Sequence, residues 1–279
     1  MQRERVSDDV YVFISDLYVQ VTAGLVTTKD GAVLIDTLPF PEETLRIKHF
    51  VESRLHTRVR YVVNTHFHAD HTTGTCFFPG ASVVAHASCR HLLDTRGRES
   101  LQQAKATSPE LQDVEIVLPD TVFESGILNL YLGGKTLQLW HTPGHSPDSI
   151  VCLLKEERIL FGGDTVMPLP YFVDGSYDDF LASLRSLQGW NFEHIVPGHG
   201  EVILRGEIDD KLQEDIDYLL VLQQKVDKAL GGASPDKALT ALNVEKCGKS
   251  RILLNGVVEQ LHRQNVNNLA NMRRTISSL

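Results

Sequence analysis

The sequence lacks the long apolar runs of a membrane protein, since no stretch approaches the ~20 residues of a spanning helix. Residues 1–9 are polar and charged, unlike the apolar segment of a signal peptide. Cysteine is scarce: the four residues are scattered and form no Cys-x-x-Cys pair, so no disulfide framework is indicated. We therefore expect reduced, partly buried cysteines and a cytoplasmic protein without a membrane span.

The chain has no excess of basic residues: acidic residues outnumber them, and the formal net charge is −9. A general nucleic-acid binder normally presents a basic face, so nucleic acid is not the expected partner. We expect a small-molecule substrate instead. The chain has no short internal repeat and no low-complexity tract. Its 279 residues, 42% hydrophobic and 23% charged, suit a globular protein with one large domain or one domain and an appendage.

The first two-thirds of the chain alternates strand and helix patterns. Short apolar runs between turn signals are typical of buried strands. They predict strands at 10–14, 17–26, 32–35, 60–63, 82–85, 127–132, 136–140, 150–154, 159–161 and 195–196. Helices are expected at 41–56, 87–93 and 178–187.

The pattern changes after Gly206. Apolar residues recur at spacings of three and four from Ile208 to Leu230, which predicts an amphipathic helix, and a final long helix is expected over 253–276. We therefore divide the chain into a core, residues 1–206, and a helical extension, residues 207–279. The extension either covers the core, with a surface for a homo-oligomer, or forms one wall of a substrate pocket; the sequence leaves both open.

Seven residues of metal-binding type stand out by their spacing. They are His66, His68, Asp70, His71, His145, Asp164 and His199. The first four fall within six positions, and each of the other three directly follows a glycine. Imidazole and carboxylate suit zinc, iron or manganese. Seven such groups exceed the needs of one metal and suit two metals that share a ligand.

The seven residues follow four separate predicted strands, and the carboxyl ends of strands are where α/β sheets build their sites. His66 and His68 are two apart, so in extended backbone they can bind one cation from the same side. Asp70 and His71 could serve a second cation. Asp164 has two oxygens and is the natural bridge. The other seven histidines have no partner at ligand spacing, and we expect them to be surface or packing residues.

These motifs closely resemble those of the metallo-β-lactamase-fold hydrolases, which carry His-x-His-x-Asp-His, a lone histidine, a bridging acid and a final histidine. All seven positions match. The resemblance implies an α/β (α+β) fold: a four-layer αββα sandwich as the catalytic core, here with a C-terminal helical extension. It implies one metal on His66, His68 and His145, and a second on Asp70, His71 and His199. Asp164 would touch both.

Two departures from the family pattern bear on function. The true β-lactamases are secreted and carry cysteine or serine where this chain has Asp164, so β-lactam hydrolysis is not the main expectation. An aspartate bridge is shared by the glyoxalase II, lactonase, cyclase-like, ribonuclease Z-like and persulfide dioxygenase branches. Many members also have a glycine pair after the first motif, and Thr73 replaces one of these glycines.

The expected activity is metal-dependent hydrolysis of an ester, thioester or lactone bond by a hydroxide that bridges two divalent ions. Zinc is the expected metal, and iron and manganese are the alternatives. Asp70 is the expected catalytic residue, moving a proton to the leaving group. Tyr171 or Tyr177 could contact substrate, although packing roles are favoured, and Asn64 could support the motif turn. Lys246, Lys249 and Arg251 lie where glyoxalase II holds glutathione. Alternatives are an iron-dependent persulfide dioxygenase, a phosphodiester hydrolase, a weak β-lactamase and a non-catalytic binding protein.

Overall fold

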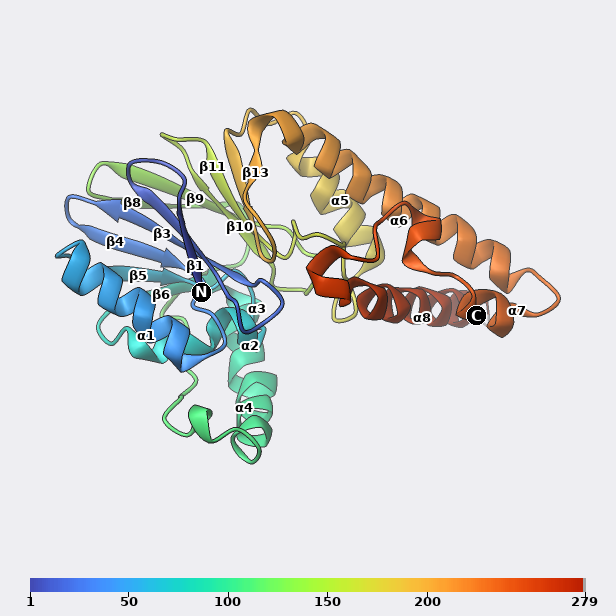
Figure 1. The fold of residues 1–279 in the computed structure, drawn as a ribbon, viewed down its shortest axis with the longest axis horizontal. Coiled ribbons are helices and arrows are strands. Elements are labelled where there is room, and N and C mark those ends of the chain that lie inside the picture. The colour runs from blue at the N-terminus through green and yellow to red at the C-terminus, as the bar shows by residue number, and fades with distance from the viewer. Residues whose placement is uncertain (278–279) are drawn as a thin grey trace.

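The computed structural model describes residues 1–277 and places two β-sheets face to face (Figure 1). The first sheet has the strand order β1-β2-β3-β4-β5-β6-β7 and the second β13-β12-β11-β10-β9-β8. The first comprises β1 (Gln2–Arg5), β2 (Val10–Ile14), β3 (Thr22–Thr28), β4 (Gly31–Ile35), β5 (Val59–Val63), β6 (Ser82–His86) and β7 (Thr121–Phe123). The second comprises β8 (Ile127–Leu132), β9 (Lys135–His141), β10 (Ile150–Leu154), β11 (Ile159–Gly163), β12 (His194–Pro197) and β13 (Ile203–Leu204).

Helices cover the outer face of each sheet and form the extension. They are α1 (Pro41–His49), α2 (Ala69–Thr72), α3 (Ala87–Leu92), α4 (Arg98–Lys105), α5 (Tyr177–Leu187), α6 (Ile208–Leu230), α7 (Pro235–Thr240) and α8 (Val258–Ser277). Ile47 of α1 packs in one apolar cluster with Leu25 and Leu34 of the first sheet. Phe180 of α5 packs in another with Leu160 of the second.

The main core lies between the two sheets. Val33 and Val63 of the first sheet pack in one cluster with Leu139 and Phe161 of the second, and all four side chains are buried. Strands such as β4 and β10 are buried at every position because a sheet or helix covers each face. This explains their continuous apolar sequence. The predicted four-layer αββα sandwich with a C-terminal helical part is confirmed.

The helical extension projects from the second sheet, with α6 and α8 leading away from the sandwich and α7 at the far end (Figure 1). One apolar cluster joins Leu160 of β11 to Leu212 of α6 and Val266 of α8. The extension therefore shares its core with the sandwich. The domain boundary between residues 206 and 207 stays a prediction.

Several segments differ from the sequence prediction, which placed no strand at β1, β7 or β13 and no helix at α4. Two further differences are turns. Residues 17–20 form a turn, not the start of a strand, and β3 begins only at Thr22. The last helix begins at Val258, after a short 3-10 turn at Leu253–Gly256. Both turns contain non-glycine residues with positive φ, which backbone propensity does not predict.

The expectations about cysteine and membrane spans can be compared with the structure. All four cysteines are unpaired, and Cys89, Cys152 and Cys247 are buried, as expected for small apolar residues. Among the described residues, no helix combines the length and apolar character that crossing a bilayer requires.

Candidate metal centre

The seven predicted ligand residues converge at one edge of the sandwich, although they come from both sheets. β5 leads into His66, and α2 carries Asp70 and His71. In the second sheet, β9 leads to His145, β11 to Asp164 and β12 to His199. Three sets of these side chains place their ligand atoms within 4.8 Å of one another. The sequence placed the seven at four strand ends, and the structure brings those ends together.

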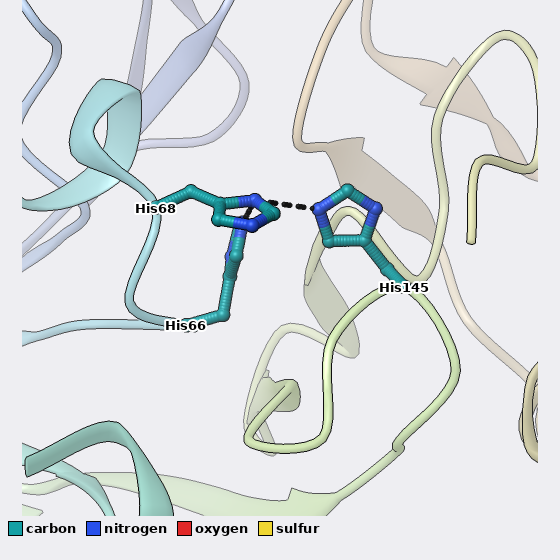
Figure 2. A group of neighbouring side chains, drawn as sticks. All are labelled: His66, His68 and His145. Atoms are coloured by element: carbon teal, nitrogen blue, oxygen red, sulfur yellow. Dashed lines mark hydrogen bonds between the residues drawn. The ribbon is translucent and has the colours of Figure 1, made fainter. Parts of the chain in front are cut away.

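Three imidazole nitrogens face one another in the first set, which Figure 2 shows. Nδ1 of His68 lies 3.1 Å from Nε2 of His66 and 2.9 Å from Nε2 of His145. These are the three residues expected to hold one metal.

The second set lies beside the first and is joined to it by Asp164. Nε2 of His199 is 3.3 Å from Oδ2 of Asp70, and Nε2 of His71 is 3.7 Å from the same oxygen. Asp164 places Oδ1 3.3 Å from Nε2 of His71 and Oδ2 3.3 Å from Nε2 of His145. One carboxylate therefore reaches both sets, as a bridging ligand must.

The outward nitrogen of each of these five histidines is already hydrogen-bonded. The acceptors, at 2.7–3.1 Å, are the Thr65 hydroxyl for His66, Asp174 for His68, Asp36 for His71, the Tyr171 carbonyl for His145 and the Val19 carbonyl for His199. Carboxylates and carbonyls only accept, so these ring nitrogens carry the proton. The Thr65 hydroxyl donates to Asp36 at 2.7 Å and is left to accept from His66.

The inward nitrogens consequently carry lone pairs when the rings are neutral. Lone pairs that face each other at about 3 Å cannot form hydrogen bonds with one another, and a shared cation resolves the conflict. Nε2 of His71 and Oδ1 of Asp164 are buried and have no hydrogen-bond partner. Buried polar atoms of this kind need an explanation, and a metal ion supplies one. The donor set therefore fits two divalent cations.

The electrostatics of the site agree with this arrangement. Burial lowers the pKa of His66 well below its ordinary value and that of His145 to about 4, so both have free lone pairs at neutral pH. Burial also opposes charge on His71, but Asp164 and its neighbouring carboxylates outweigh it and raise the His71 pKa. Burial opposes charge on Asp164 too, and His71 leads the neighbours that hold its pKa well below the usual range. Protons therefore occupy the position that a cation would take.

A glycine is required where β12 meets the bridging acid. A Cβ atom at Gly198 would collide with Oδ1 of Asp164 and with the backbone of Gly163. The glycine before His199 thus allows close backbone approach, as its position in the motif predicts.

The comparison with known families agrees with the fold and with the motifs. Residues 18–199 match the model of the metallo-beta-lactamase superfamily. The chain belongs to this superfamily. That match spans all seven ligand residues and leaves the helical extension outside it.

Curated relatives fall into two groups by the extent of the match. The beta-lactamase-like protein 2 homolog of Caenorhabditis elegans is 27% identical, with 85% of this chain and 80% of that protein covered. The atrochrysone carboxyl ACP thioesterase of Aspergillus fumigatus is 29% identical over 63% of this chain and 52% of its own length. The thioesterase pkgB of Emericella nidulans is 29% identical over 64% and 46%. The chain thus spans about half of the two thioesterases.

A solved structure confirms the fold. The metallo-beta-lactamase from Pontibacter korlensis superposes with a TM-score of 0.64 at 24% identity. The match covers 78% of this chain and 98% of that chain.

Sequence reasoning missed three residues that hold the ligands in place. Asp36, in a left-handed conformation after β4, accepts from Thr65 and from Nδ1 of His71 at 2.8 Å. Asp174 accepts from Nε2 of His68 at 3.0 Å and from Arg96 at 2.7 Å. An acid at the end of a buried strand was a signal for Asp36. Asp174 lies in a turn and Arg96 in the π-helix Leu93–Gly97, and neither gave a signal.

The other residues singled out from sequence take separate places. Tyr171 lines the cavity over the metal centre, and its hydroxyl donates to Gln264 at 2.6 Å. Tyr177 is buried and donates to the Leu219 carbonyl. It is therefore a packing residue, the role that the sequence favoured. Asn64 donates to Thr75 and supports the motif turn.

Thr73 and three basic residues of the extension were also singled out from the sequence. Thr73 is helical, with φ −54°, so the missing glycine costs this turn nothing. Lys246, Lys249 and Arg251 do not line the cavity over the metal centre, and a glutathione site on them stays a prediction. Lys249 instead pairs with buried Asp215 at 2.8 Å.

Replacing Asp174 with asparagine is expected to weaken zinc binding about 10- to 100-fold, the usual effect of losing a partner of a metal-binding histidine. The variant loses the carboxylate that orients His68 and its ion pair with Arg96. Zinc titration against a competing chelator measures this change. The exposed Asp178→Asn serves as the matched control, and an Asp174→Asn protein with unaltered zinc affinity would refute the role.

Proposed function

We propose that this protein is a hydrolase that uses two divalent metal ions to cleave an ester, thioester or lactone bond. Zinc is the metal we favour. The observation that carries the proposal is the convergence of five inward imidazole nitrogens and two carboxylates beside a cavity of about 620 Å³, where Nε2 of His71 and Oδ1 of Asp164 are buried without a hydrogen-bond partner. The names of two relatives, both thioesterases, support acyl transfer to water as the reaction.

Bound cations would lower the pKa of a coordinated water from ~15.7 to about 7 and polarise the substrate carbonyl. The chain's own groups do the remaining work. His66, His68 and His145 would hold one cation, Asp70, His71 and His199 the other, and Asp164 would hold both at a fixed separation. Apart from Asp70 and His68 these side chains are at most 6% exposed, and burial strengthens the charge interactions among them.

Asp70 is the carboxylate best placed to move a proton. Its side chain is 18% exposed against 4% for Asp164, so it lies toward the open side of the centre, and it lines the cavity. It can therefore accept a proton from the attacking water and pass it to the leaving group.

The cavity walls disfavour two alternatives. Among the described residues, no lysine or arginine lines the cavity. A phosphodiester of nucleic acid and a glutathione thioester both carry anionic groups that such side chains would bind. Hydrolysis of a less charged substrate fits the site better.

The deciding experiment is a screen of thioesters, esters, lactones, β-lactams and phosphodiesters on protein of measured zinc, iron and manganese content, with oxygen uptake recorded in parallel. We expect hydrolysis of an acyl substrate without oxygen consumption. Oxygen-dependent turnover of a persulfide by iron-loaded protein, or activity on phosphodiesters alone, would overturn the proposal. In the same screen, Asp70→Asn should lose turnover, and full turnover at normal metal content would exclude Asp70 from proton transfer.

A further inference from the structure

The cavity over the metal centre has apolar walls contributed by three separate parts of the chain. The β2–β3 turn supplies Tyr18 and Val19, and the loop after Asp164 supplies Val173. The helical extension supplies Leu254, Val257 and Leu261. The polar floor is thus confined to the metal-binding residues and their partners, and the space above it is bounded largely by hydrocarbon.

Charge is absent from these walls above the floor. Their polar side chains include the neutral amides of Gln260 and Gln264, and Gln264 already accepts from the Tyr171 hydroxyl. In the described part of the chain two cations contact lining residues, and both are paired. The Arg96 guanidinium pairs with Asp174 and lies over the Phe67 ring at 4.8 Å. Lys211 donates to the Met167 carbonyl at 2.8 Å and pairs with buried Asp215. A bound group that extends away from the metals therefore meets no free positive charge.

Two strained turns present these apolar walls. Val19 and Gln20 have φ of 42° and 52°, and Leu254 and Asn255 have φ of 49° and 55°. None is glycine, and a β-branched valine in this region is a genuine outlier. Contacts to the metal-binding loop hold the first turn, because the Val19 carbonyl accepts from His199 and the Gln20 carbonyl from Gly200.

The second turn places a buried leucine in the wall of the cavity. Leu254 is only 3% exposed, whereas its strained neighbour Asn255 is exposed and does not line the cavity. Strain of this kind persists where the surrounding structure over-determines it, and it clusters at ligand-binding positions. The geometry of the turn therefore serves to direct the Leu254 side chain.

We propose that this cavity is an acyl-chain site: it binds an uncharged, apolar acyl group whose carbonyl lies at the metal centre, and Leu254 determines the preferred chain. The inference rests on the proposed hydrolase function and names its substrate class. Tyr18 and Val173, which line the cavity and are 42% and 40% exposed, continue the apolar wall to the mouth, so the chain can extend toward solvent.

The test uses N-acetylcysteamine thioesters, whose leaving group is neutral, with acyl chains from acetyl to octanoyl. We expect kcat/KM to rise about fourfold for each added methylene, the gain expected from burying one methylene group. A chain of the same length that ends in a carboxylate should be at least about tenfold poorer than its neutral counterpart, because no free cation meets it.

Leu254→Gly removes the side chain and suits the positive φ of this position, so the variant should fold. It should reduce the preference for octanoyl over acetyl about tenfold, with zinc content unchanged. Asn255→Gly is the matched control. It relieves the same kind of backbone strain at the neighbouring residue, leaves the cavity lining unchanged and should keep the wild-type preference for octanoyl over acetyl.

Binding of unreactive methyl ketones, measured by calorimetry, separates this inference from the proposed function. 2-Decanone should bind more tightly than 2-butanone in wild type, and this preference should be about tenfold smaller in Leu254→Gly. If no thioester, ester or lactone is cleaved but this binding preference appears, the hydrolase proposal fails and the acyl-chain site stands. If thioesters are cleaved without chain-length preference, or Leu254→Gly matches wild type, the acyl-chain site is overturned.

Discussion

Replacing Asp164 with asparagine is expected to lower kcat/KM by at least about 10³-fold, because bridged cations contribute several kcal/mol of transition-state stabilisation. Oδ1 of Asp164 lies 3.3 Å from Nε2 of His71, and Oδ2 lies 3.3 Å from Nε2 of His145. Among the described residues, it is therefore the one carboxylate in contact with both sets. The amide keeps the shape and loses the negative charge, so tightly bound metal should fall from two ions toward one.

Steady-state kinetics on the best substrate of the screen, with metal content by mass spectrometry, measures both effects. The exposed Asp113→Asn is the matched control and should behave as wild type. An Asp164→Asn enzyme that retains two ions and most of its activity would show that Asp164 is not the bridge.

Removing the metals should abolish activity and lower the melting temperature by about 10 °C. A ligand present at 1,000 times its Kd stabilises the folded state by about 4 kcal/mol. For a chain of this size each kcal/mol corresponds to roughly 2–4 °C. Without cations, the inward lone pairs of His66, His68 and His145 face one another without a shared partner.

Differential scanning calorimetry before and after chelation, and again after zinc is restored, follows this change. His199→Ala provides the control, since loss of one ligand from the second set should shrink the shift without removing it. A melting temperature that does not respond to chelation would mean that no metal is bound to the folded state.

The sequence predicted those parts of the molecule that local pattern determines. Helix α6 begins at Ile208 and ends at Leu230, where the apolar spacing predicted, because burial of one helix face imposes that period. The seven candidate ligand residues could be singled out because metal-binding chemistry restricts both their type and their position after strand ends. Two sheets meeting at one edge then bring the motifs together.

The remaining parts of the site depend on contacts that no local pattern encodes. The turn at Val19 is held by a hydrogen bond that His199, 180 residues later in the chain, donates to the Val19 carbonyl. The Leu254 turn interrupts a predicted helix with two left-handed residues. Asp174 meets His68 across 106 residues. Propensity and periodicity cannot anticipate such long-range partners, and these are the features that shape the cavity.

Diffraction from crystals of the zinc-loaded protein, recorded at the zinc absorption edge, tests the central claim most directly. We predict two anomalous peaks about 3.5–4 Å apart, the usual separation in two-metal sites. One should be bound by His66, His68 and His145, the other by Asp70, His71 and His199, with an Asp164 oxygen on each. A single peak, or zinc bound elsewhere, would contradict the account.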